Sequence, residues 1–118
     1  MPTLVVKVTC GVERVETLMQ AFTVAATGVA SGLEVSLWLT GDATLHALPG
    51  TDDVVIPHSP PLSTLRDAVL AAGTVTVCAQ CAARREIAEP DLLPGARIAG
   101  AAAFVAEATA ADATALVY

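Results

Sequence analysis

The sequence predicts an α/β fold, a single domain of three layers (α/β/α) built around a mostly parallel sheet of five strands. Short runs of β-branched and other apolar residues recur along the chain, as expected of strands that are buried on both faces of a parallel sheet. Segments with apolar residues at helical spacing separate these runs. The chain of 118 residues also has the usual size of one domain. We therefore expect residues 1–118 to share one core.

The first half of the chain contains two predicted strands and one long helix. Residues 4–8 form an apolar run broken only by Lys7, and a turn follows at residues 9–11. From Glu13 onward apolar residues recur at helical spacing until a Ser-Gly pair ends the helix. Residues 34–40 form the second strand. A further side of the long helix is also apolar, so we expect a neighbouring subunit to cover it.

The second half begins with the least regular segment of the chain. Residues 43–61 are rich in Pro, Gly and Asp, which predicts a long loop that covers an edge of the sheet. We expect one helical turn near Leu45 and a short extended piece at residues 54–56. Pro61 starts a helix that Gly73 ends. The remaining elements are predicted as a strand at 74–77, a helix at 79–88, a strand at 96–98, an alanine-rich helix at 99–110 and a strand at 113–118.

The amino-acid composition indicates which functions and which cellular compartment to expect for this protein. Hydrophobic residues make up 54% of the chain, which is more than a small monomer readily hides, so we expect a homo-oligomer. The formal charge of −6 and the lack of a basic face argue against nucleic-acid binding. Neither a secretory signal nor a membrane span is expected. Three cysteines without a signal peptide favour a cytoplasmic protein over an extracellular disulfide framework.

The candidate chemistry lies in residues 73–87, where a Cys-x-x-Cys motif follows a β-branched run. Cys78 ends the predicted third strand, where ligands and reactive groups collect in parallel sheets. Unpaired backbone N–H groups at the start of the following helix, together with Arg84 or Arg85, favour thiolate over thiol. We therefore predict that Cys78 is a nucleophile and that Cys81, one helical turn later, is an optional partner.

Cys10 is a third candidate, because it follows the first strand and so lies on the same edge of the sheet as Cys78. If these two strands are neighbours, their ends are roughly 5 Å apart and a thiol pair could form. Each cysteine could instead simply pack in the core. The two arginines could likewise form a solvated face or a salt bridge between subunits.

Other motifs support neither a metal nor a cofactor. His46 and His58 lie in the irregular loop. Each could be a surface residue, or could reach the thiol site and act there as an acid or base. A structural zinc site needs four ligands, and the chain has a single cysteine pair. No glycine-rich phosphate loop follows any predicted strand. The acidic residues in or just before the irregular loop, Asp42, Asp52 and Asp53, are interpreted as parts of solvated turns.

Several segments together resemble the DsrE/DsrF-like family over nearly the full length. They are Val8-Thr9-Cys10-Gly11, the helix with Ala25-Ala26, residues 32–35 into 39–42, Val77-Cys78 followed by Ala82-Ala83-Arg84-Arg85, and residues 91–96. The chain has Glu86 and Ala43 where the family commonly has glycine.

The resemblance implies a five-stranded parallel α/β domain that forms homotrimers or hexamers, with reactive cysteines near subunit contacts. In the sulfur-relay members, a cysteine at the position of Cys78 carries sulfur as a persulfide and passes it to a partner protein. Other members have a second cysteine like Cys81 and are grouped with the peroxiredoxins. Three hypotheses follow: a persulfide carrier or sulfur transferase with Cys78 as nucleophile, a thiol/disulfide redox protein pairing Cys78 with Cys81 or Cys10, and a non-enzymatic oligomeric binding module.

Overall fold

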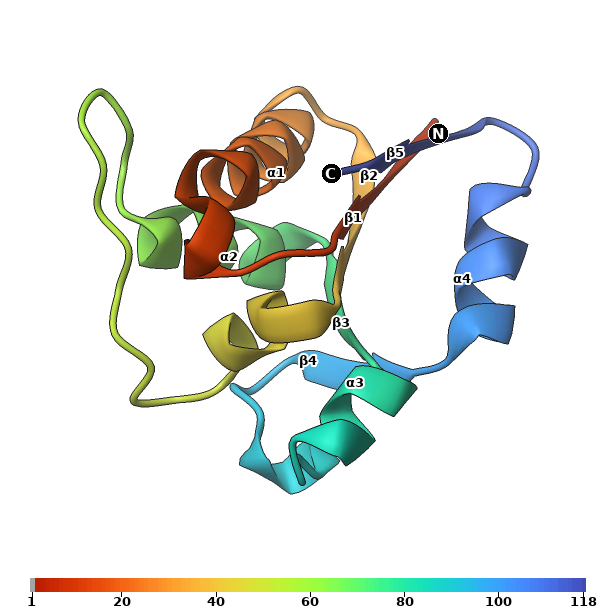
Figure 1. Cartoon of the computed structure of the whole chain (residues 1–118). Helices are drawn as coiled ribbons and strands as arrows, with labels where there is room; N and C mark the ends of the chain where they lie inside the picture. The colour runs from red at the N-terminus through yellow and green to blue at the C-terminus, as the bar shows by residue number, and fades with distance from the viewer. Residues whose placement is uncertain (1) are drawn as a thin grey trace.

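The computed structural model describes residues 2–118 and contains one sheet of five parallel strands (Figure 1). Their spatial order is β4-β3-β2-β1-β5. The prediction of a five-stranded parallel sheet is therefore confirmed. The strands are β1 (Thr3–Val8), β2 (Glu34–Leu39), β3 (Thr74–Cys78), β4 (Ala96–Ala99) and β5 (Ala113–Val117).

Helices lie on both faces of the sheet, which makes the domain the three-layer α/β/α structure that the sequence predicts. On one face lie the two longest helices, whereas α4 stands on the opposite face (Figure 1). The α-helices are α1 (Val15–Ala30), α2 (Leu62–Ala72), α3 (Ala79–Arg84) and α4 (Ala101–Ala108), and the 3₁₀ helices are η1 (Val12–Arg14), η2 (Gly41–Ala47) and η3 (Glu89–Asp91). No helix within residues 2–118 is long and apolar enough to cross a membrane.

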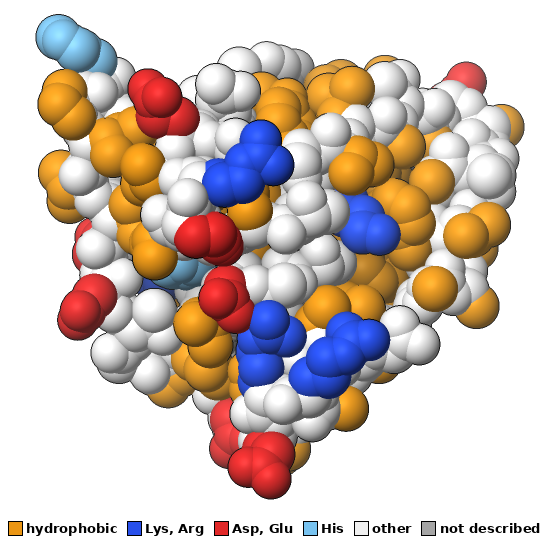
Figure 2. All heavy atoms as spheres, viewed as in Figure 1, with side chains coloured by type: hydrophobic (Ala, Val, Ile, Leu, Met, Phe, Trp, Pro, Cys, Tyr) orange, Lys and Arg blue, Asp and Glu red, His pale blue; other side chains and the backbone are white. Residues whose placement is uncertain are grey.

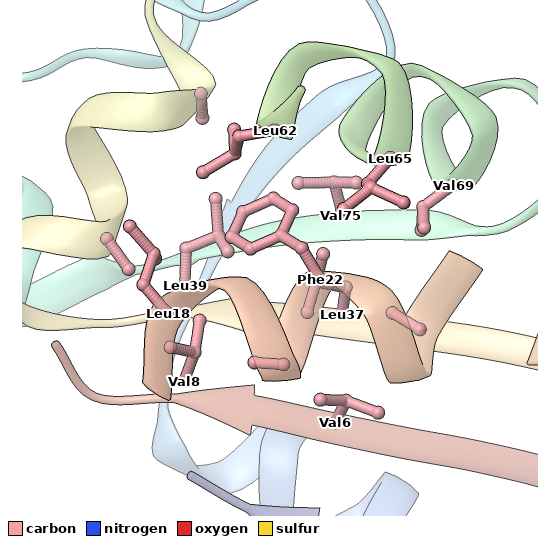
Figure 3. Packing of buried hydrophobic residues seen from close by; sticks show 14 of the residues in the cluster. Val6, Val8, Leu18, Phe22, Leu37, Leu39, Leu62, Leu65, Val69 and Val75 are labelled. Atoms are coloured by element: carbon pink, nitrogen blue, oxygen red, sulfur yellow. The ribbon is translucent and has the colours of Figure 1, made fainter. Parts of the chain in front are cut away.

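The hydrophobic core lies between the sheet and the pair α1 and α2. Figure 3 shows Phe22 of α1 among side chains from the sheet and from α2. Residues that alternate along each strand supply the sheet side of this core, as the two-residue period of a strand requires. The fully buried strand residues on this face are Val6, Val8, Leu37, Leu39, Val75 and Val77.

The opposite face of the sheet is more polar and is only lightly covered. By the same alternation it presents Lys7, Ser36, Trp38, Thr76 and Cys78 toward α4. None of the residues of α4 is buried. The helix is instead held by its single carboxylate, Glu107, which accepts hydrogen bonds from Ser36 and Trp38 of the sheet, and by an edge-to-face contact between Phe104 and Trp38.

Two local expectations about the chain differ from the structure, whereas the expected subunit contact on the second apolar side of α1 stays a prediction. On that side Ala21 is fully buried within the chain, while Ala30 is exposed. Segment 48–61 passes along the outer side of α1 and α2 rather than covering an edge of the sheet (Figure 1). Its Val54 joins the core, and Asp53 accepts hydrogen bonds from the backbone N–H and the hydroxyl of Ser63 at the start of α2. Because Pro61 has no side chain that can cap the helix, Asp53 takes that role.

Helix α3 is shorter than predicted and ends at Arg84 instead of residue 88. Glu86 adopts a left-handed conformation with φ of 55°. The N–H groups of Glu86 and Ile87 bond back to the carbonyls of Ala83 and Ala82, the pattern of a Schellman motif. Glycine usually occupies the left-handed position of this motif, so a helix stop here could not be recognised from a glutamate.

Candidate functional site at the carboxyl end of β3

Cys78 is the last residue of β3 and faces a cavity of about 240 Å³ beneath α4. Its side chain is half-buried, whereas Cys10 and Cys81 are buried. The cavity is lined from the sheet by Lys7, Trp38 and Thr40, and from the helical segments by Gln80, Ala101, Phe104 and Val105. Figure 2 shows hydrophobic side chains gathered over the part of the surface between β1 and α4. The site therefore combines an accessible thiol with a mostly apolar wall.

The surroundings of Cys78 favour its thiolate form. Burial opposes ionisation of this thiol, but hydrogen bonds from the backbone N–H groups of Cys81 and Gln80, a hydrogen bond from the Cys81 side chain, and the positive charge of Lys7 outweigh it. The net effect lowers the pKa of Cys78 below its ordinary value. A lower pKa gives more thiolate near neutral pH, and the thiolate is the nucleophile.

Lys7 belongs to this site although the sequence did not single it out as a functional residue. Its ammonium lies 4.8 Å from the centroid of the Phe104 ring, and that ring meets Trp38 edge to face with centroids 5.4 Å apart. The sequence contained one indication of this role, because Lys7 is the one charged residue within the apolar run of the first strand. Charged residues are rarely fully buried, and in the structure Lys7 lines the cavity.

Cys81 lies next to Cys78 but points into a more enclosed region, with only 8% of its surface exposed. Its sulfur accepts a hydrogen bond of 3.3 Å from the backbone N–H of Gly41, and Nη1 of Arg84 lies 3.9 Å from it. Gly41 has a left-handed φ of 56°, and a Cβ added at this position would lie 3.0 Å from the Thr9 carbonyl oxygen, so a side chain here would be strained. The Cys81 side chain also contributes to the lowered pKa of the Cys78 thiol.

The two arginines contact Cys81 and Asp42, and neither contacts the Cys78 thiol. Arg85 forms an ion pair of 2.8 Å with Asp42 and donates a bond of 3.1 Å to the Cys81 carbonyl. Arg84 approaches the Cys81 sulfur. Neither arginine lines the cavity that Cys78 faces. Among the described residues, the cation that favours the Cys78 thiolate is therefore Lys7.

Cys10 is not brought to Cys78, because β2 lies between β1 and β3 in the sheet. Two strand spacings amount to roughly 9–10 Å, more than the Cα separation that a disulfide spans. Cys10 also packs in the core beneath α1, where its thiol approaches the Arg14 carbonyl at 3.8 Å. Burial and the Glu13 carboxylate raise the pKa of this thiol. The condition for a Cys10 and Cys78 pair, that their strands are neighbours, is not met.

The two histidines lie away from the thiol cavity. His46 is buried in η2 beside Arg66, and burial followed by the Arg66 charge lowers the pKa of its imidazole. His58 has a left-handed φ of 63° and lines a separate cavity between α1 and segment 56–59. Neither residue is placed to act as an acid or base at Cys78.

These features define an α/β protein with one accessible, activated thiol at the carboxyl edge of a parallel sheet. The family model of the DsrE/DsrF-like family matches residues 7–114, and the chain belongs to this family. Sulfur relay is the process with which the family is associated.

Among solved structures, the crystal structure of the ychN protein from E. coli matches with a TM-score of 0.83, covering 100% of each chain at 21% sequence identity. That likeness concerns the fold. No curated protein sequence matches the chain.

Proposed function

We propose that the protein is a persulfide carrier in which Cys78 accepts a sulfur atom from a donor and passes it to an acceptor. The observation that supports this most directly is the contrast among the three thiols. Cys78 alone of them is half-buried and faces a cavity, and the pKa of its thiol is lowered, whereas the pKa of the enclosed Cys10 thiol is raised. A sulfur carrier needs this combination of access and thiolate character.

The transfer requires no oxidant. The Cys78 thiolate attacks the outer sulfur of a donor persulfide, a new sulfur–sulfur bond forms on Cys78, and the donor bond breaks with its electron pair leaving on the inner donor sulfur. The proton of the donor persulfide remains on the transferred sulfur. Cys81 and the backbone N–H groups near it stabilise negative charge on the Cys78 sulfur before the attack.

The test is sulfur loading followed by intact-protein and peptide mass spectrometry. The protein is treated with a persulfide donor, and a gain of one sulfur atom on the peptide that contains Cys78, removed by a reducing thiol, is expected. Cys78→Ser abolishes the gain, while the matched variant Cys10→Ser keeps it. Undiminished loading of Cys78→Ser on any other residue would refute the assignment.

A thiol/disulfide redox function is the second candidate, favoured by the position of Cys81 three residues after Cys78 and by the contribution of its side chain to the lowered pKa of the Cys78 thiol. In this case a peroxide is reduced to water or alcohol while the two thiols lose two hydrogens and form one disulfide. Mild peroxide treatment followed by peptide mapping distinguishes the two functions. A rapid Cys78–Cys81 linkage together with no sulfur loading would favour the redox function.

A third candidate is a non-enzymatic binding module. It would be preferred if all three cysteines resist alkylation in the native protein and titrate near the unperturbed value of about 8.5.

The proposal includes a cytoplasmic homo-oligomer, trimer or hexamer, that exchanges sulfur with donor and acceptor proteins. The strand β5 is an edge strand, and its Leu116 and Val117 are 37% and 64% exposed. Val105 on α4 is 56% exposed. An exposed apolar edge strand is a site where chains associate, and the high hydrophobic content of the sequence supports the same inference.

A further inference from the structure

The cavity at Cys78 is lined by a positively charged side chain, Lys7, in addition to the thiol. Among residues 2–118, Lys7 is the one charged residue that lines it. The other lining groups are aromatic, aliphatic or neutral and polar. The protein as a whole carries a formal charge of −6, so a cation that faces a mostly apolar cavity stands out against the rest of its charge distribution.

Lys7 also lacks a counter-ion among residues 2–118. On the same face of the sheet, Arg97 is paired with Glu107 at 2.7 Å, and at the nearby edge Arg85 is paired with Asp42 at 2.8 Å. Lys7 forms no salt bridge within the described part of the chain, and its ammonium rests over the Phe104 ring. A contact of this kind contributes about 0.5–2 kcal/mol and leaves the other ammonium donors free. The charge is therefore available to a ligand.

The register of the sheet sets the distance between this charge and the thiol. Lys7 of β1 pairs with Trp38 of β2, which pairs with Thr76 of β3, and Cys78 lies two residues further along β3 on the same face. Two strand spacings of roughly 9–10 Å separate β1 from β3, and the long side chain of Lys7 reaches across part of this gap. The remaining space is the cavity, whose size suits a molecule of a few heavy atoms.

We propose that this cavity binds a small sulfur-carrying substrate with an anionic group, such as a mercapto acid in its persulfide form, with Lys7 holding the carboxylate while the sulfur meets Cys78. This inference rests on the proposed function and names the substrate class for it. Trp38 and Phe104 form the wall against which the carbon skeleton of the substrate packs. Lys7 is a binding residue in this scheme, and Cys78 is the residue that reacts.

The chemical step is the transfer described above with the donor defined. The Cys78 thiolate attacks the outer sulfur of the mercapto acid persulfide, the bond between the two donor sulfurs breaks, and the mercapto acid leaves as its thiolate. The thiolate then takes a proton from water. The carboxylate does not react, and its ion pair with Lys7 orients the donor.

Binding is measured first without any sulfur transfer, by using the intrinsic fluorescence of Trp38. This residue is the only tryptophan of the chain and lines the cavity, so its emission reports occupancy. Mercaptoacetate and its methyl ester, which has no charge, are titrated into the reduced protein, into Lys7→Met and into Lys7→Arg. We expect the unmodified protein to bind mercaptoacetate about tenfold more tightly than the ester, as a charge-assisted contact predicts. Lys7→Met should lose this preference and Lys7→Arg should keep it.

Equal affinity for the acid and the ester in the unmodified protein would overturn the proposal, and so would an unchanged preference in Lys7→Met or the lack of any fluorescence change with either ligand. The comparison of acid with ester needs no variant, so it decides the question even if Lys7→Met does not fold.

Sulfur loading then separates this inference from the proposed function. The persulfides of mercaptoacetate and of its methyl ester are compared as donors, and the ratio of their loading rates on Cys78 is expected to fall about tenfold in Lys7→Met. Equal loading by both donors, with the ratio unchanged in Lys7→Met, overturns the anion site and leaves the carrier function in place. A fluorescence preference for the acid that depends on Lys7, with no loading by either donor, supports the anion site and overturns the carrier function.

Discussion

Removal of the Glu107 carboxylate is expected to loosen α4 from the sheet and to expose Cys78. Glu107 accepts hydrogen bonds from the Ser36 hydroxyl at 2.5 Å and from Trp38 Nε1 at 3.1 Å, and it pairs with Arg97 at 2.7 Å. No residue of α4 is buried, so this carboxylate and the Phe104 contact hold most of the helix in place. The substitution considered is Glu107→Ala.

The size of the effect follows from the groups that the carboxylate leaves behind. Ser36 and Trp38 are only 7% and 1% exposed, and a buried donor without its partner costs about 1–3 kcal/mol. The Arg97 side chain is 42% exposed, so the loss of its ion pair adds at most about 1 kcal/mol. Because water can enter once α4 moves, we expect the free energy of unfolding to fall by about 2–4 kcal/mol.

The assay combines urea denaturation with the rate at which Cys78 is alkylated in the native protein. Ala101, Phe104 and Val105 of α4 line the cavity of Cys78, so opening of the helix should raise that rate at least about tenfold. Glu16→Ala is the matched control, because Glu16 is an exposed helical carboxylate on α1, and a change there is expected to stay within about 0.5 kcal/mol. Wild-type stability and an unchanged alkylation rate in Glu107→Ala would refute the view that this carboxylate fastens α4.

Four further predictions concern separate parts of the molecule. Because the pKa of Cys78 is lowered and that of Cys10 raised, the rate of alkylation of Cys78 should rise at lower pH than that of Cys10, and Lys7→Met should move the Cys78 profile to higher pH, as followed by peptide mass spectrometry. The hydrogen bond from the Ser63 hydroxyl lowers the pKa of Asp53, so the stabilisation by this carboxylate is present above its ordinary pKa and is lost as the pH falls through the lowered value. Asp53→Asn should therefore destabilise the protein at neutral pH and have little effect in strong acid, and equal effects in urea titrations at both pH values would count against it. Glu86→Gly should raise the free energy of unfolding by up to about 1 kcal/mol by relieving the left-handed conformation, and a loss of stability would contradict that assignment. Leu116→Lys on the edge strand should shift the protein toward smaller species in analytical ultracentrifugation, and an unchanged distribution would mean that β5 is not the contact.

Much of the fold could be predicted because strands and helices have short periods that are visible in the sequence. Apolar runs marked the strands β1, β2 and β3, and helical spacing marked α1 and α2. The end of α3 was missed because Glu86, and not glycine, takes the left-handed position. The path of segment 48–61 was also missed, since its anchors, Val54 in the core and Asp53 on Ser63, are contacts between residues about ten positions apart with no periodic pattern.

The candidate site was predicted in part. The placement of Cys78 at the carboxyl end of a strand followed from local pattern and general rules for parallel sheets, and the structure has it there. The pairing with Cys10 depended on the strands being neighbours, and the order β3-β2-β1 separates them. The arginines were expected beside Cys78 because they follow it closely in sequence, but Arg85 turns to Asp42 and Arg84 to the Cys81 sulfur.

The sequence by itself determined the alternation of strands and helices, the parallel sheet and the position of the Cys78 thiol at its edge, because each of these depends on residues that are close together in the chain. Tertiary structure alone decided which charge acts on that thiol. Lys7 lies 71 positions before Cys78 and meets it through the register of three strands and the docking of α4. Contacts of this kind are set by strand order and by the face on which each side chain emerges, which the local pattern of a single segment does not specify.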